Sequence, residues 1–232
     1  MYCIQIAMDI LSFLQSTSLG KSLSEAQMEI LAKSAIEKKY RAGQSIVGDG
    51  HEIRDFYIVA RGTIKMSKSA HDGKEQILCL LGPGQLFGMC AVFSDYIFPA
   101  NAMTLEKSTL LVVPDTVFKD LAREDPTILF NMLSILSVRL KEAMLLIESL
   151  SLMDTPKRLA CFLLFSHLKH TCSEGDIAKL AISQKELSKI LGTTPETISR
   201  VLKKLAAEKI IRVTGRNIRI LSCEALEELA TG

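Results

Sequence analysis

The chain contains no tryptophan, only four histidines and only six cysteines, which are scattered at positions 3, 79, 90, 161, 172 and 223. This scatter is typical of reduced thiols and argues against a disulfide framework. Charges interrupt the apolar stretches well before the roughly 20 residues that a membrane-spanning helix needs. The N-terminal stretch carries Asp9, no basic cluster and no small-residue cleavage site, unlike a signal peptide. We therefore expect a cytoplasmic protein without membrane contact.

Signatures of catalysis are also missing. The sequence has no nucleophile–base constellation, no phosphate-binding glycine loop and no HExxH-type zinc motif, so we do not expect an enzyme. His167 and His170 stand close together with Cys172 nearby, but this set lacks a fourth ligand and is a weak signal for zinc. We interpret these residues as structural, and the metal ligands, if any, are unknown.

What the sequence does contain begins with a glycine-punctuated stretch at residues 42–113. Glycine recurs there between short runs such as Phe56–Val59, Thr63–Met66 and Gln76–Leu81. Short strands separated by regular turn signals predict a compact antiparallel barrel or roll. The segment His71–Lys74 suits a hairpin turn between two of these strands. A helical stretch near Ser24–Lys38 precedes them.

From Pro126 to Met153 the apolar period changes to that of a helix. Spacings of alternately four and three residues form a heptad seam, which is typical of a coiled-coil dimer. A helix packed on its own barrel is the alternative. We favour self-association because Met144, Leu145 and Leu146 leave a second apolar face for the barrel. The seam consists of Leu129, Leu133, Leu136, Leu140, Ala143, Ile147 and Leu150.

A break follows this long helix. Asp154, Thr155 and Pro156 end it, with Thr155 as the expected cap and Pro156 at the first position of the next helix, over Lys157–Lys169. The break predicts a hinge between domains. The predicted domains are a sensor domain at 1–125, a dimerisation helix at 126–153 and a C-terminal domain at 154–232.

The C-terminal part is predicted to hold two short helices and a hairpin. Ser183 is a good N-cap that can form a capping box with Glu186, and Gly192 ends the first helix. The second helix opens at Thr193–Glu196, where either threonine can cap it and Pro195 loses only an N–H that would have no partner. Its inward stripe is Ile198, Val201, Leu202 and Leu205. The hairpin consists of Ile210–Thr214, a turn at Gly215–Asn217, and Ile218–Leu221.

Charge separates this segment from the rest of the chain. Residues 183–221 carry nine Lys or Arg and three Glu, whereas the whole chain has a net charge of +2. An ordinary helical hairpin with solvated charges is the alternative interpretation. A basic module on a nearly neutral chain favours nucleic-acid binding, because neutralising phosphates releases their counterions. A polar, Arg-bearing second helix also suits the major groove of DNA.

Barrel, long dimerising helix, short hinge and winged helix–turn–helix, in this order, resemble the CRP/FNR superfamily of bacterial transcription regulators. The resemblance covers nearly the whole chain. Its motifs are Gly-Gln-Leu-Phe-Gly at 84–88, Arg139-Leu140 in the long helix and Pro-Glu-Thr-Ile-Ser-Arg at 195–200. It implies an α+β fold with an N-terminal antiparallel β-roll of the cyclic-nucleotide-binding type, a long dimerisation helix and a C-terminal winged helix–turn–helix.

The resemblance also implies that Glu196, Ser199 and Arg200 read base edges. Arg200 suits O6 and N7 of guanine, Glu196 suits a cytosine amino group, and Ser199 is small enough to approach a thymine methyl. A homodimer would present two such helices to half-sites about one helical turn apart, which implies a palindrome with a TGA-type core. RNA polymerase is a further implied partner. Other expected DNA contacts are Thr194, Thr197, Lys203, Lys185 and Arg216.

Two signals known in the superfamily lack matching residues here. Its cyclic-nucleotide binders use a glutamate directly after the Phe-Gly pair and an arginine before the next strand, where this chain has Met89 and residues 98–100, Phe-Pro-Ala. Ala143 and Met144 replace the two hydroxyl residues of the long helix that meet the purine. Iron–sulfur members need clustered N-terminal cysteines, and only Cys3 lies there. We expect neither cyclic AMP nor an iron–sulfur cluster.

The remaining pattern is an apolar pocket, which resembles the nitric-oxide-responsive regulators of the DNR and HcpR type that are associated with haem. The segment Ile147–Leu152 also resembles that branch. A haem b is therefore the expected cofactor, with a His, Cys or Met side chain as its iron ligand. The expected pocket residues are Phe87, Gly88, Met89, Cys90, Phe98, Met103, Met144 and Ile147.

Together these features predict a dimeric regulator whose DNA affinity depends on a signal bound between roll and long helix. The ligand would shift the population toward the dimer geometry that matches the half-site spacing. One open alternative is a member of the same superfamily that responds to cyclic AMP or another small molecule, or binds DNA constitutively. The other is a cyclic-nucleotide-type regulatory subunit without DNA binding.

Overall fold

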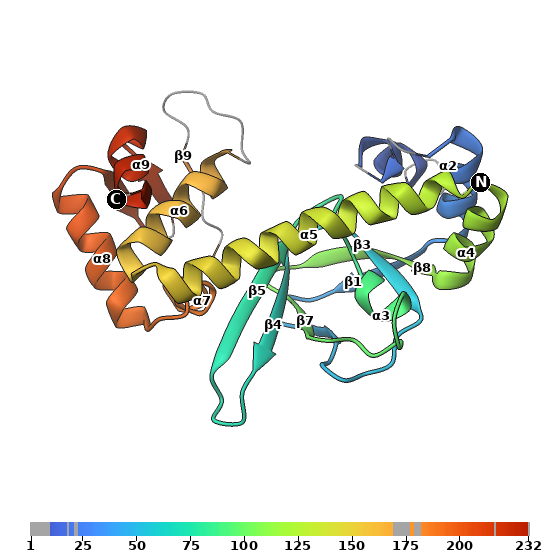
Figure 1. The fold of residues 1–232 in the computed structure, drawn as a ribbon, viewed down its shortest axis with the longest axis horizontal. Helices are drawn as coiled ribbons and strands as arrows, with labels where there is room; N and C mark the ends of the chain where they lie inside the picture. The colour runs from blue at the N-terminus through green and yellow to red at the C-terminus, as the bar shows by residue number, and fades with distance from the viewer. Residues whose placement is uncertain are drawn as a thin grey trace. The chain divides into compact units, whose positions relative to one another are not determined.

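The computed structural model describes residues 10–17, 19–20, 23–168, 177–178, 182–215 and 217–231. The chain forms two compact units, residues 1–73 with 78–141 and residues 74–77 with 142–232. Helix α5 (Thr127–Leu152) is continuous, beginning in the first unit and ending in the second (Figure 1). The border between the two units lies inside α5, between residues 141 and 142. The domain boundaries after residues 125 and 153 therefore stay predictions.

The first unit contains the predicted antiparallel roll. One sheet has the strand order β1-β8-β3-β6 and the other β2-β7-β4-β5. In the first sheet β3 pairs with β8 in the register Phe56↔Val113 to Val59↔Leu110. The strands are β1 (Ile36–Tyr40), β2 (Ser45–Val47), β3 (Asp55–Arg61), β4 (Ile64–Ser69), β5 (Glu75–Leu81), β6 (Leu86–Phe87), β7 (Asn101–Thr104) and β8 (Ser108–Pro114).

Glycines allow the tight connections of the roll. Gly73 has a φ of 82° and its amide donates to the carbonyl of Ala70, which confirms the predicted turn between β4 and β5. Gly62 joins β3 to β4 with a φ of 90°, and a Cβ there would lie 2.2 Å from Ser108 Oγ. Only glycine combines this conformation with such a close approach.

Helix α2 (Glu25–Ser34) is shorter than predicted. Ser24 and Gln27 form a reciprocal capping box at its start. Its end is at Ala35, which has extended backbone angles, and the next residues form β1. The expectation of helix up to Lys38 was therefore wrong at its last four residues, because hydrogen bonding to β8 outweighs their local helix propensity.

Two apolar cores fill the first unit. The interior of the roll holds Val59, Ile64, Phe87 and Phe98 among others. The second core lies where α2, α3 (Met89–Val92), α4 (Asp115–Glu124) and the start of α5 meet the roll. Helix α5 contributes Ile128 and Met132 to it, with Ile135 and Leu136 packed against them. This packing face of α5 was not identified from the sequence.

The second unit contains α6 (Thr155–Leu168), β9 (Ile177–Ala178), α7 (Gln184–Ile190), α8 (Pro195–Ala207), β10 (Ile211–Thr214), β11 (Asn217–Ile220) and α9 (Cys223–Thr231). The three strands form an antiparallel sheet in the order β10-β11-β9. At the start of α6, Asp154 Oδ1 accepts a hydrogen bond from the Lys157 amide at 3.0 Å. Asp154 is therefore the cap, and the expectation of Thr155 was wrong because the helix begins at Thr155 itself.

No helix in the described ranges is long and apolar enough to cross a membrane.

Candidate nucleic-acid interface

The helix–turn–helix consists of α7, a turn and α8. Ser183 Oγ accepts from the Glu186 amide at 3.1 Å at the start of α7. The chain then turns at Gly192, whose φ is 59°. Thr194 rather than Thr193 caps α8, because Thr194 Oγ1 accepts from the Thr197 amide at 3.3 Å. Pro195 occupies the first position of α8, as predicted.

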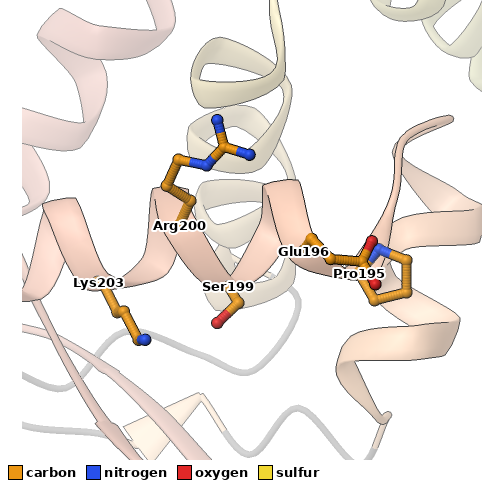
Figure 2. A pocket seen from close by; sticks show the side chains of 5 residues that line it. All are labelled: Pro195, Glu196, Ser199, Arg200 and Lys203. Atoms are coloured by element: carbon orange, nitrogen blue, oxygen red, sulfur yellow. The ribbon is translucent and has the colours of Figure 1, made fainter.

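The two faces of α8 differ completely in polarity. The inward side chains Ile198, Val201, Leu202 and Leu205 are buried, as the spacing predicted. The outward residues line an open hollow of about 530 Å³ formed by Pro195, Glu196, Ser199, Arg200 and Lys203. In Figure 2 these side chains project from one length of the helix, with Ser199 and Lys203 to one side and Arg200 to the other. The structure thus brings the three predicted base-reading residues onto one accessible face.

The carboxylate of Glu196 is prepared to accept hydrogen bonds. Its own backbone amide and the hydroxyl of Thr194 hold the pKa of Glu196 below its ordinary value. Both groups belong to the first turn of α8, where unpaired N–H groups favour negative charge. The side chain is therefore ionised at neutral pH, which is the form that accepts from a cytosine amino group.

Of the other predicted DNA contacts, Lys203 lines the hollow, whereas Thr194, Thr197 and Lys185 do not. Thr194 and Thr197 lie at the start of α8, where their hydroxyl oxygens are 3.2 Å apart. Lys185 lies exposed in the first turn of α7. Arg216 lies outside the described residues.

The wing next to the helix–turn–helix carries exposed arginines. Strands β10 and β11 pair in the register Ile211↔Ile220 to Thr214↔Asn217, which confirms the predicted hairpin to within a residue. Ile211 and Ile218 are buried, whereas Arg212 and Arg219 are exposed directly opposite each other. The wing therefore adds positive charge to the second unit.

The heptad seam of α5 is mostly exposed in the single chain. Leu133 is 59% exposed, and Leu140 and Ile147 are each 64% exposed. Leu136 is half-buried and packs against the second core. An apolar stripe of this length on one helix is typical of a surface that another chain covers.

The predicted effector residues do not form one cluster. Phe87 and Phe98 lie together in the roll interior, with ring centroids 6.2 Å apart, and Phe87 stacks on Tyr57 at 4.8 Å. Met89 is buried in the second core, and Cys90 is exposed on α3. Met103 is half-buried on β7, and Met144 and Ile147 are mostly exposed on the part of α5 that belongs to the second unit.

Gly88 separates Phe87 from Met89. It has a φ of 100° and precedes α3. A Cβ at this position would lie 2.7 Å from the carbonyl oxygen of Asp55, so the close approach requires glycine. Strand β6 ends at Phe87 and α3 begins at Met89, and these two neighbours of Gly88 belong to different cores.

No group of three or more His, Cys, Asp or Glu side chains that could hold a metal lies within the described part of the chain. The side chain of His167 and all of His170, Cys172 and Cys3 lie outside the described residues. His51 is exposed, with its ring 3.4 Å from the Asp49 carbonyl oxygen, and His71 is exposed in the turn before β5.

Both parts of the chain are similar to known protein families. Residues 37–125 match the family described as Cyclic nucleotide-binding domain, and residues 157–229 match the Crp-like helix-turn-helix domain. The chain is similar to the cyclic AMP receptor protein of Thermus thermophilus, with 29% identity over 94% of this chain and 99% of the relative. It is similar to the fumarate and nitrate reduction regulatory protein of Vibrio cholerae, with 30% identity over 90% of this chain and 84% of the relative.

A solved structure shows the same architecture. FixK2 from Bradyrhizobium japonicum matches with a TM-score of 0.78 and 25% identity, over 85% of this chain and 98% of that chain. The family matches indicate the same two parts as the structure, namely a roll and a helix–turn–helix. The chain belongs to the CRP/FNR family of transcription regulators.

Proposed function

We propose that this regulator binds as a homodimer to a palindromic DNA site with a TGA-type core and acts on RNA polymerase. The observation that carries the proposal is the outward face of α8. It places Glu196, Ser199 and Arg200 on one accessible face of the helix, opposite a buried apolar stripe. A guanidinium, a carboxylate and a small hydroxyl on one helix face are suited to direct readout in the major groove.

Dimerisation through α5 supplies the second half of the palindrome. The seam side chains Leu129, Leu133 and Leu140 are at least 48% exposed, and burying such leucines contributes about 1.5–3 kcal/mol each. A parallel pair of α5 helices would cover them and hold two α8 helices at a fixed separation. The half-site spacing of the DNA then follows from the dimer.

The replacement Arg200→Ala tests the base readout. It should abolish the preference for the palindrome, a loss of about 1–3 kcal/mol of discrimination per half-site, while salt-dependent binding to unrelated DNA persists. Competition binding of palindromic and scrambled duplexes measures both quantities. Lys204→Ala is the matched control, because Lys204 lies on α8 beside Glu208 at 4.0 Å and does not line the hollow. Unchanged sequence preference in Arg200→Ala would refute the assignment.

The signal is proposed to be neither cyclic AMP nor oxygen acting on an iron–sulfur cluster. In the position of the nucleotide-binding glutamate, Met89 is 3% exposed and belongs to an apolar core. In the position of the phosphate-binding arginine, Phe98 is buried in the roll interior. A cyclic phosphate placed there would be desolvated without a cationic partner, which is costly.

We propose that the signal is nitric oxide acting through a haem, and the resemblance to regulators of that type supports this proposal. A haem does not fit the interior of the roll in this conformation, because the rings of Tyr57, Phe87 and Phe98 occupy it. The absorption spectrum of haem-reconstituted protein tests the proposal: a Soret band that shifts when nitric oxide is added would mean that another conformation admits the haem, and a missing band or an unshifted one rejects the haem. Cys90→Ser tests the exposed thiol on α3 as the iron ligand.

A further inference from the structure

Arg158 connects two parts of the second unit that lie far apart in sequence. It stands in the first turn of α6, and its backbone amide donates to the Asp154 carbonyl at 3.0 Å. Its Nε donates to the carbonyl of Met153 at 2.9 Å, directly after the end of α5. Its Nη1 donates to the carbonyl of Leu191 at 2.7 Å, at the end of α7. One guanidinium thus bridges the hinge and the turn of the helix–turn–helix.

The accepted carbonyl at Leu191 is a structurally sensitive one. Leu191 is the C-cap of α7, so its carbonyl is among those that no amide within the helix reaches. The next residue, Gly192, starts the turn into α8 with a φ of 59°. The Thr193 amide then donates to the Ser188 carbonyl at 2.9 Å. The hydrogen bond from Arg158 to the Leu191 carbonyl therefore fixes the start of the turn that leads into α8.

The last turn of α5 packs against the same place. A Cβ built on Gly192 would lie 2.7 Å from Leu150 Cδ2 and 3.4 Å from Arg158 Nη1. The ends of α5 and α7 and the start of α6 therefore meet at one corner of the second unit (Figure 1). A change in the direction of α5 would therefore act on the turn through these contacts.

The chemistry of arginine suits this bridge. Its donors are held in a rigid planar fork, so two bonds from one guanidinium fix the relative position of both acceptors. Bonds from a charged donor are roughly twice as strong as neutral ones. The neighbouring side chains Leu159 and Leu163 are fully buried, but apolar packing of this kind is not directional.

We propose that Arg158 is a positioning residue that sets the orientation of the helix–turn–helix relative to the end of α5. The inference rests on the proposed function, because in a dimer this orientation determines the distance between the two α8 helices. Arg158 does not line the hollow on α8. Its loss should therefore change which half-site spacing is bound, and leave the base preference within a half-site intact.

The experiment uses the full chain and palindromes that differ only in the spacer between their half-sites. Arg158→Met keeps the aliphatic stem and removes all donors. The preference for the best spacer over its neighbours should fall from roughly tenfold or more to about twofold, because a misplaced second helix loses its base contacts. Lys157→Met is the matched control, since it removes the same charge at the adjacent position and should keep the wild-type spacer preference.

A second variant keeps the test valid if Arg158→Met does not fold. Arg158→Lys retains the charge and can satisfy one carbonyl at a time, so it should fold and still lose most of the spacer preference. Retention of the wild-type preference in either folded Arg158 variant overturns the proposal. So does an equal loss of base preference at each half-site, which would mean that Arg158 only supports the fold.

Hydrogen exchange separates this proposal from the proposed function. Without DNA, exchange of the Thr193 amide should be faster in Arg158→Met and unchanged in Lys157→Met. If wild-type protein shows no preference for any palindrome, the proposed function fails, while faster exchange still supports the bridge. Unchanged exchange in Arg158→Met rejects the bridge whatever the DNA results are.

Discussion

Arg212 lies directly opposite Arg219 on the exposed face of the wing. Neither side chain contacts a carboxylate within the part of the chain that the structure describes. Like charges at directly opposite positions of an antiparallel pair destabilise it. Repulsion between the two arginines therefore lowers the stability of the wing in the free protein, and an anionic partner such as DNA would relieve it.

The replacement Arg219→Glu should separate these two effects. The free energy of unfolding should rise by about 0.2–1 kcal/mol, because the introduced carboxylate would face Arg212 as an opposite charge. Affinity for DNA should fall to a similar extent for all sequences, with a shallower salt dependence. Chemical denaturation and salt-titrated binding measure the two changes. A sequence-selective loss would instead mean that Arg219 contacts bases.

The cap of α8 also lowers the pKa of Glu196, which is proposed to read bases. Thr194→Ala should destabilise the protein by about 1 kcal/mol, since it removes the acceptor for the Thr197 amide. It should also raise the pKa of Glu196 toward its ordinary value, because the Thr194 hydroxyl lowers that pKa in the wild type. An NMR titration of the Glu196 carboxyl measures the shift.

The pH dependence of base discrimination follows from the same shift. Because the pKa of Glu196 is lowered, its carboxylate form persists to a lower pH than that of an ordinary glutamate. It is lost only as the pH falls through that lowered value. In Thr194→Ala, discrimination by this side chain should be lost at a higher pH. Thr193→Ala is the control, as Thr193 does not cap the helix. An identical pH profile for all three proteins would contradict this coupling.

Tyr57 provides a spectroscopic probe of the roll interior. Burial, followed by the charges of Asp55 and Tyr40, raises its pKa to about 12 from 10.0. Its neutral form therefore contributes stability that is complete below pH 10 and is lost as the pH rises toward about 12. The chain has four tyrosines and no tryptophan, so tyrosinate absorbance reports this directly. A late titration step should disappear in Tyr57→Phe, and its persistence there would assign it to another tyrosine.

The dimer seam can be tested without disturbing the roll. Leu133→Glu with Leu140→Glu should weaken the dimer by about 100-fold or more, because two leucines lose their burial. Sedimentation measures the change. Val138→Glu is the control: Val138 is equally accessible at 58% exposed but lies on the opposite side of α5. Wild-type dimerisation in the double variant would place the interface elsewhere.

Local signals were sufficient for most of the fold. The turn around Gly73, the cap at Ser183, the proline at position 195 and the wing strands follow from residues within a few positions of one another. The same holds for the outward face of α8, because helical spacing alone separates Ile198 from Ser199. Where local signals compete, the sequence was misleading: residues 36–38 form β1 through pairing with β8.

The sensor residues show the limit of reasoning along the chain. Phe87 and Met89 were both expected to line one apolar pocket. The change from β6 to α3 at Gly88 places them in different cores. Side chains two positions apart share a face only where the backbone between them stays extended, and Gly88 instead has a positive φ at its close approach to the Asp55 carbonyl.

The sequence alone determined the order of the elements, the basic charge of the C-terminal module and which side chains of α8 face outward, because periodicity, caps and charge are local properties. Only the tertiary structure decided which core each apolar residue joins and which residue joins the hinge to the turn before α8. Arg158 carries no motif that marks it, and one of its acceptors lies 33 residues away at Leu191. Such a bond depends on how three helices meet, which no local pattern encodes.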